Sequence, residues 1–207
     1  ALYYDTLTQK VFGTNGTAIL KACLAEPLQF QDPYTFNAFG PNDRPGRLAL
    51  SVRDFARFGL LYLRHGRWRE RELIRPEFIG LALHSPLPAG TPLTSGREVD
   101  LLPHQRSIGG TGNITPVGPG FYSFNWWTNG RDRDGHRLFA DLPPDTFVAA
   151  GHGGIRMLWV VPDFDLVIVW NDTRVQDQDA SPGDPNTRCN QAARLIRQAV
   201  AEAAPPP

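Results

Sequence analysis

TFVAAGHGGIRMLWVVPDFDLVIVW, residues 146–170, is the segment from which the architecture can be inferred most directly. Its three runs of β-branched and aromatic residues, 146–150, 155–161 and 166–170, predict three strands. Pro162-Asp-Phe-Asp165 is a four-residue turn, so we expect the last two strands to pair antiparallel. The glycines at 151, 153 and 154 would let a ligand or another backbone approach the first strand closely.

The segment C-terminal to these strands predicts a helix. Asp184-Pro185 begins it, and the chain then frays at Pro205-Pro206-Pro207. Its apolar residues recur at helical spacing and form one stripe that a sheet could cover. The stripe consists of Cys189, Ala192, Ala193, Ile196, Ala199, Val200 and Ala203. We therefore expect an α+β fold in which an antiparallel sheet is backed by a C-terminal helix.

The segment N-terminal to these strands predicts a hairpin, a long loop and two helices. Residues 121–128 have strand character, and the turn-rich residues 129–135 connect them to 136–140, which predicts the hairpin. Residues 85–120 are rich in Gly, Pro, Ser and Thr and predict a long loop or two loops around a brief strand. Pro76 opens a helix that extends to about His84. An earlier core helix follows Ser51-Val-Arg-Asp54, which is a capping box, and ends at Gly66.

The first fifty residues predict a smaller helical and loop part. Residues 2–11 and 18–25 predict two short helices, and the turn formers in 31–47 predict a structured loop. Ala1 reads as the middle of a helix with neither a methionine nor a cap before it, so we expect the fold to be incomplete at its N-terminus. We divide the chain into a helical and loop-rich part, 1–145, and a part with the core strands and terminal helix, 146–204, within one structural domain.

The composition narrows the classes of partner. Twenty-one basic residues balance 21 acidic ones, so no net field attracts nucleic acid or an anionic membrane. No apolar run approaches the roughly 18 residues that span a bilayer, and the compartment stays open because any export signal would lie upstream. Cys23 and Cys189 are far apart and lack a C-x-x-C spacing, and we expect two buried free thiols.

Few residues stand out as chemical groups. His152, between glycines and two strands, is an accessible acid, base or hydrogen-bond donor, although a turn or a core histidine would look the same. The other histidines lack metal-ligand spacing, and Gly109-Gly-Thr-Gly112 lacks the Lys-Ser/Thr of a phosphate loop, so we expect neither a metal nor a cofactor. Tyr122 and Trp126 belong to an aromatic run that lines either an apolar pocket or the core.

Several stretches resemble, in order, the β-lactamase-related serine hydrolases, which include class C β-lactamases, penicillin-binding proteins, peptidases, esterases and amide hydrolases. Glu26-Pro-Leu28 resembles the end of one family helix. The stretch Arg47-Leu-Ala-Leu-Ser-Val-Arg-Asp-Phe-Ala-Arg-Phe-Gly59 resembles the next. Glu72-Leu-Ile-Arg-Pro-Glu-Phe78, 122–127, His152-Gly-Gly154 with Val160-Val-Pro162, and the terminal helix follow in the family's order. The resemblance runs from about residue 8 to residue 201.

The resemblance implies roles for individual residues. His152-Gly153-Gly154 would replace the family's Lys-Thr-Gly or His-Thr-Gly strand, with His152 as the basic group and the N–H of Ile155 as an oxyanion donor. Tyr122, Trp126, Gly153 and Gly154 would contact a small ester, amide or peptide-like substrate. Gly153 departs from the family's threonine, which lowers the case for β-lactamase or D,D-peptidase activity.

The nucleophile of the family, a serine three residues before a lysine, is missing. Leu7 precedes Lys10 at that spacing and Ala18 precedes Lys21, so no S-x-x-K exists. Tyr3 and Tyr4 come too late to be the family's second-motif tyrosine. We expect a parent serine hydrolase whose N-terminal segment carries the serine and complements this chain, which alone would be inactive. A non-catalytic binding or sensory domain, or an unrelated α+β domain, remains the alternative.

Overall fold

A five-stranded antiparallel sheet forms the centre of the computed structural model, which describes residues 5–38, 45–91, 99–102, 105–107, 119–151, 155–171, 184 and 187–203. Its strand order is β11-β10-β9-β8-β7, and Trp159 of the interior strand β10 pairs with Val148 on one side and Ile168 on the other. The strands are β7 (Tyr122–Ser123), β8 (Trp126–Thr128), β9 (Phe147–Gly151), β10 (Arg156–Val161) and β11 (Leu166–Trp170). The three strands expected in 146–170 and the turn between the last two are confirmed.

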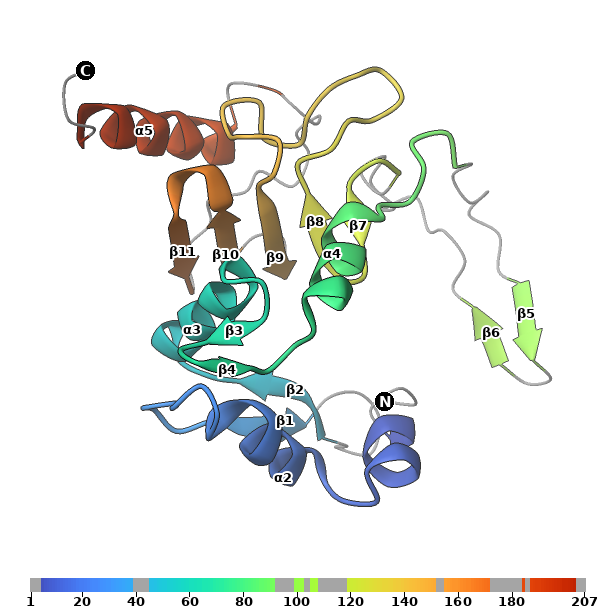
Figure 1. Cartoon of the computed structure of the whole chain (residues 1–207). Coiled ribbons are helices and arrows are strands. Elements are labelled where there is room, and N and C mark those ends of the chain that lie inside the picture. Colours follow the sequence, from blue (N-terminus) through green and yellow to red (C-terminus); the bar gives the residue numbers. More distant parts are fainter. Residues whose placement is uncertain are drawn as a thin grey trace.

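Two helical layers cover the sheet because side chains alternate along each strand (Figure 1). Leu158 and Val160 of β10 pack with Tyr62 beneath α3 (Val52–Leu63) and α4 (Pro76–His84). Met157 and Trp159 point to the opposite face, where Ala193 and its neighbours from α5 (Arg188–Ala203) cover them. The expected α+β architecture, an antiparallel sheet backed by the C-terminal helix, is thereby confirmed.

Helix α3 begins at its expected cap and lies unusually close to the sheet. The backbone N–H of Asp54 donates to Ser51 Oγ at 3.1 Å, as the capping box predicted. A Cβ built on Gly59 would come within 2.5 Å of a Leu158 methyl group, so a larger residue here would force the packed side chains of β10 and β11 to shift. The chain leaves the helix through Gly66, whose φ of 85° suits glycine.

The remaining described elements are short. They are η1 (Thr6–Val11), α2 (Gly16–Leu20), η2 (Lys21–Ala25), β1 (Thr35–Ala38), β2 (Pro45–Ala49), β3 (Arg67–Trp68), β4 (Arg71–Glu72), β5 (Val99–Leu102), β6 (Gln105–Ser107) and η4 (Pro162–Phe164), in which η1 and η2 are π-helices and η4 is a 3-10 helix. The loop expected over 31–47 is wrong in part, because β1 and β2 pair there with Phe36 opposite Leu48. Turn formers dominate this segment, and the pairing that makes it a hairpin is not a local signal.

The hairpin expected between 121–128 and 136–140 is also wrong. The chain turns back within the first run, at Phe124 and Asn125, so that β7 pairs with β8. Residues 136–140 form no strand because the buried Asn129 holds this segment instead. Its Nδ2 donates to the carbonyls of Phe139, Leu142 and Pro143, and its Oδ1 accepts from the N–H of Phe139 at 2.8 Å.

The two cysteines lie in different environments. Cys189 is buried against the sheet as expected, but Cys23 is exposed on η2, so the expectation of two buried thiols is wrong for Cys23. The two cysteines form no disulfide with each other. Across the described part of the chain, every helix is too short or too polar to traverse a bilayer.

Candidate active site

One end of the central sheet holds Gly151 and Ile155, the two described residues that flank the motif at 152–154. Gly151, the last residue of β9, pairs with Arg156, the first of β10, so the connection between these strands lies at that end. Ile155 is half-buried and directly precedes β10. His152, Gly153 and Gly154 lie outside the described residues, and the structure fixes only the two strands between which they run.

The described residues next to this connection leave space. Gly151 is exposed, and a Cβ built on it would meet nothing within 4 Å. On the neighbouring strand, Arg156 donates from Nε to Asn171 Oδ1 at 3.0 Å, which ties the start of β10 to the residue after β11. A glycine without neighbours at its Cβ position, at the end of a strand, allows a ligand to approach the backbone of β9 closely.

The β7–β8 hairpin reaches the same end of the sheet (Figure 1). β8 and β9 are antiparallel, and Trp127 pairs with Val148. The turn at Phe124 and Asn125, which precedes β8, therefore lies beside the C-terminal end of β9. Tyr122 is partly exposed and donates its hydroxyl to Asn125 Oδ1 at 3.0 Å. Sequence reasoning could not find this proximity, because it depends on the register of β8 against β9.

Trp126 lies in the core beneath this hairpin. It is 4% exposed, and its ring stacks on Phe58 and packs against Tyr62 and Phe147 at centroid distances of 6.1, 4.6 and 5.1 Å. This is the core alternative that the aromatic run left open. The indole supports the β8 strand from below, and Tyr122 is the residue of the pair with an accessible polar atom.

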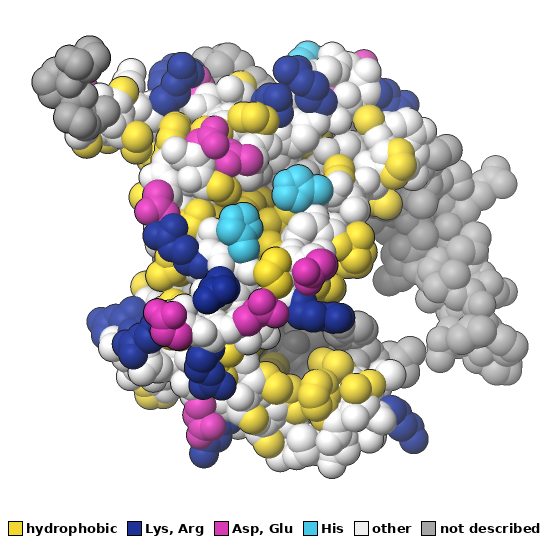
Figure 2. All heavy atoms as spheres, in the orientation of Figure 1, with side chains coloured by type: hydrophobic (Ala, Val, Ile, Leu, Met, Phe, Trp, Pro, Cys, Tyr) yellow, Lys and Arg dark blue, Asp and Glu magenta, His cyan; other side chains and the backbone are white. Residues whose placement is uncertain are grey.

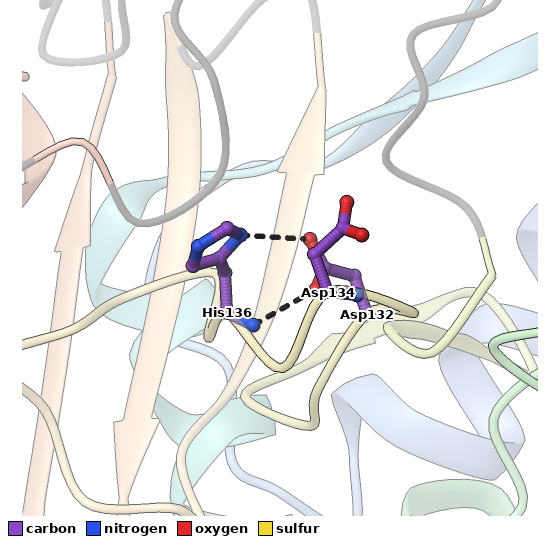
Figure 3. A group of neighbouring side chains, drawn as sticks. All are labelled: Asp132, Asp134 and His136. Carbon is purple, nitrogen blue, oxygen red and sulfur yellow. Dashed lines mark hydrogen bonds and ion pairs between the residues drawn. The ribbon is translucent and has the colours of Figure 1, made fainter.

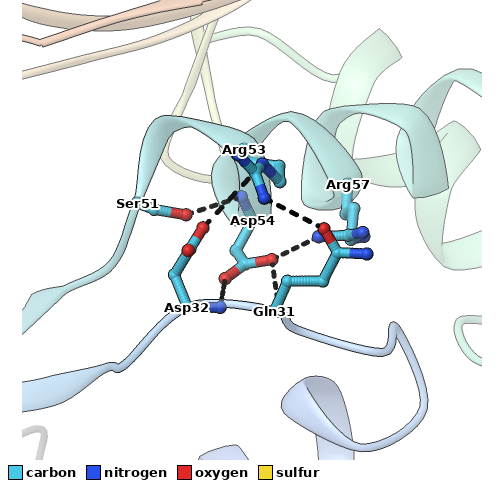
Figure 4. Close-up of polar contacts among 6 residues, drawn as sticks. All are labelled: Gln31, Asp32, Ser51, Arg53, Asp54 and Arg57. Carbon is cyan, nitrogen blue, oxygen red and sulfur yellow. Dashed lines mark hydrogen bonds and ion pairs between the residues drawn. The ribbon is translucent and has the colours of Figure 1, made fainter.

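A second polar group, which sequence reasoning did not assemble, anchors the backbone at Gln31 and Asp32 to α3 (Figure 4). The fully buried carboxylate of Asp54 accepts the N–H groups of Gln31 and Asp32 at 3.1 and 3.0 Å and pairs with Arg57 at 2.5 Å. Burial would raise the pKa of Asp54, but these hydrogen bonds and the Arg57 charge outweigh it and lower the pKa below its usual value. A carboxylate held ionised by backbone donors is a structural tie.

Asp132, Asp134 and His136 bring three possible metal ligands within 4.8 Å of one another (Figure 3). One Asp132 oxygen accepts the N–H groups of Asp134 and His136 at 2.9 and 2.8 Å, and the other lies 3.6 Å from His136 Nδ1. These bonds close a surface turn between β8 and β9, and this role in the turn explains why an aspartate is present at position 132. We assign the cluster to that turn.

Positive and negative side chains are mixed on the face of the molecule that Figure 2 shows. Figure 2 shows Lys and Arg side chains interspersed with Asp and Glu, without a broad area of one sign. On this face the described residues build no extended field for a polyanion.

Comparison with solved structures identifies the type of fold. The crystal structure of a "putative beta-lactamase from Bacteroides dorei DSM 17855" superposes with a TM-score of 0.51 at 13% sequence identity. The superposition covers 94% of this chain and 54% of that protein, so the chain spans about half of its neighbour's length. No family profile and no curated protein matches the sequence. The chain therefore has a β-lactamase-like fold, and its activity must be argued from its residues.

Proposed function

We propose that this chain is the C-terminal part of a serine hydrolase related to class C β-lactamases and penicillin-binding proteins. It would form an acyl-enzyme with a small ester, amide or peptide-like substrate. The observation that supports the proposal most is the coincidence of a β-lactamase-like fold with an open sheet end, where Gly151 and Ile155 flank the resembling motif. The fold alone does not define a function.

Each residue at the sheet end receives a proposed role. The N–H of Ile155 would donate to the oxyanion that develops on the acyl carbon, and His152 would supply a basic group beside it. Gly153 and Gly154 would let the substrate approach the backbone, and Tyr122 would bind the substrate from the hairpin. Trp126, with its ring in the core, would act by holding β8 in place.

We place the nucleophilic serine and its lysine in a segment outside these 207 residues, because no S-x-x-K occurs within them. The outer edge of β11 is a place where such a segment could add a strand. Among the described strands only β10 pairs with β11, and residues 166–170 carry no charge that would discourage further pairing. This chain alone would then be inactive.

A non-catalytic binding or sensory domain with the same fold is the second candidate. The feature that favours it is Gly153, which removes the hydroxyl that the family's threonine offers to a substrate carboxylate. Such a domain would keep the open sheet end and lose the acylation chemistry.

Labelling with a fluorophosphonate separates the two candidates. The coding region is expressed together with its upstream sequence, and the labelled residue is located by mass spectrometry. The hydrolase predicts a labelled serine upstream of Ala1 and no label within residues 1–207. Label within this chain contradicts the missing nucleophile, and no label on the longer protein favours the binding domain.

A matched pair of variants tests the oxyanion donor. Ile155→Pro removes the N–H, whereas Ile155→Ala keeps it and removes most of the side chain. We expect the acylation rate to fall by about 100-fold or more in the proline variant, as for other oxyanion-hole deletions, and to change little in the alanine variant. Equal rates in both variants would exclude this N–H from the reaction.

A further inference from the structure

An exposed apolar cluster lies beside the open sheet end. Phe78 and Phe124 are 44% and 51% exposed, and their rings meet edge to face at a centroid distance of 6.4 Å. Leu81, one turn further along α4, is 49% exposed. We call these three side chains the aromatic cluster. Helix α4 contributes two of them and the β7–β8 turn contributes the third (Figure 1).

The backbone under Phe124 is unfavourable for a bulky residue. Phe124 and Asn125 have φ values of 43° and 68°, the left-handed pair of a two-residue hairpin turn. Asn and Gly are the residues that suit such a turn, and phenylalanine at positive φ is an outlier. Burial does not compensate here, because Phe124 is about half exposed. A strained residue that presents an apolar ring to solvent is a pointer to binding rather than to packing.

The size of the cluster argues for a small occupant. Three large side chains, each about half exposed, offer about 300 Å² of apolar surface. A stable protein partner would bury roughly 800 Å² on each side. The cluster therefore fits a single aryl or branched alkyl group better than a protein surface.

The position of the cluster suggests what carries that group. The turn at 124–125 lies at the end of the sheet that also holds Gly151 and Ile155. In the same turn, the hydroxyl of Tyr122 donates to Asn125 Oδ1, so polar groups adjoin the residue that carries the Phe124 ring. Ligand sites combine an apolar wall with a few convergent polar groups in this way.

We propose that the aromatic cluster is a subsite for an aryl or branched alkyl substituent of the substrate, with the amide or ester group directed toward Ile155. This inference rests on the proposed hydrolase function for the identity of its ligand. It narrows the substrate class to esters and amides with one bulky apolar substituent.

Binding of two amides to the chain of 207 residues tests the subsite. The probes are N-benzylacetamide and N-methylacetamide, which share the amide and differ in the aryl group, and ligand-observed NMR measures Kd. We expect N-benzylacetamide to bind at least tenfold more tightly than N-methylacetamide. Phe124→Gly and Phe78→Ser should each weaken N-benzylacetamide at least fivefold. Leu195→Ser, a control on α5 at a residue that is 66% exposed, should leave its Kd unchanged.

Phe124→Gly also separates binding from folding. Glycine accepts the positive φ, so the melting temperature should stay the same or rise while the ligand is lost. Equal affinity of both amides, or unchanged binding in both phenylalanine variants, overturns the proposal. Self-association that disappears in Phe124→Gly would also overturn it, because the cluster would then be a protein interface.

The binding experiment needs no nucleophile, so its outcome is independent of the labelling experiment. Aryl-dependent binding without labelling of the longer protein supports the subsite and rejects the hydrolase. Labelling without aryl-dependent binding supports the hydrolase and rejects the subsite.

Discussion

Replacing Asp54 by asparagine should destabilise the protein more than any other single loss of a charge among the described residues. The buried carboxylate uses one oxygen for Gln31 N–H and Arg57, and the other for Asp32 N–H. Asparagine keeps one acceptor oxygen and turns an NH₂ group toward a backbone donor (Figure 4). A hydrogen bond to a charged group contributes about 1.5–3 kcal/mol, and a buried donor without an acceptor costs about as much, so we expect a loss of about 2–4 kcal/mol.

The same substitution should change how stability depends on pH. The pKa of Asp54 is lowered in the folded protein, so the folded state binds fewer protons than the unfolded chain as the pH falls through the ordinary carboxyl range. The contribution of Asp54 is therefore complete above the unfolded pKa of about 3.9 and is lost as the pH falls toward the lower folded pKa. We expect the difference between wild type and Asp54→Asn to be large at pH 7 and to shrink below pH 4.

Urea unfolding monitored by tryptophan fluorescence at pH 7 and pH 3 measures both effects. Asp165→Asn is the matched control, since Asp165 forms a two-bond ion pair with Arg64 but both side chains are more than half exposed. We expect no measurable change in that variant, because water screens such a pair. Equal losses in Asp54→Asn and Asp165→Asn, or a loss at Asp54 that is independent of pH, would refute the role assigned to the Asp54 carboxylate.

Three further substitutions test the fold. Gly59→Ala should destabilise by about 1–3 kcal/mol despite the better helix propensity of alanine, because the added methyl group collides with Leu158, and thermal unfolding measures this. Asn129→Asp should cost about 3 kcal/mol or more in urea unfolding, because a carboxylate would face three carbonyl oxygens where the amide now donates. Burial and the neighbouring Asp163 raise the pKa of Asp145. The folded state therefore favours protonated Asp145, and this contribution to stability is lost as the pH rises and the carboxyl group ionises. Asp163→Asn should therefore raise the melting temperature by about 2 °C at pH 7 and leave it unchanged at pH 3.

The parts of the fold that were predicted correctly have local causes. The cap at Ser51, the first position of Pro76 in α4 and the alternating strands of 146–170 each follow from a few neighbouring residues. The incorrect parts depend on distant contacts. Residues 136–140 have strand composition, but the single side chain of Asn129 satisfies the backbone groups of this segment. The carboxylate of Asp54 fitted a capping box, yet it binds the backbone 22 residues earlier.

The candidate site divides in the same way. The proposal for Ile155 came from a motif within four residues, and the structure adds that this residue directly precedes the interior strand β10. The aromatic cluster could not be found from sequence, because α4 and the β7–β8 turn are separated by about 40 residues. Nothing in the sequence indicates that Phe124 has a positive φ, because this conformation depends on the turn between β7 and β8.

The two halves of the proposed site are held together by one strand pair. β9 leads to Gly151, near the proposed oxyanion donor at Ile155, whereas β8 leads back to the strained turn, and the pairing of Trp127 with Val148 fixes the distance between them. Beneath this pair, Trp126 packs on Phe147, so the register of the two strands is reinforced by a buried aromatic contact. A slip by one residue would expose that contact and separate the apolar rings from Ile155. We therefore expect that both the stability of the protein and its substrate selectivity depend on the buried side chain of Trp126.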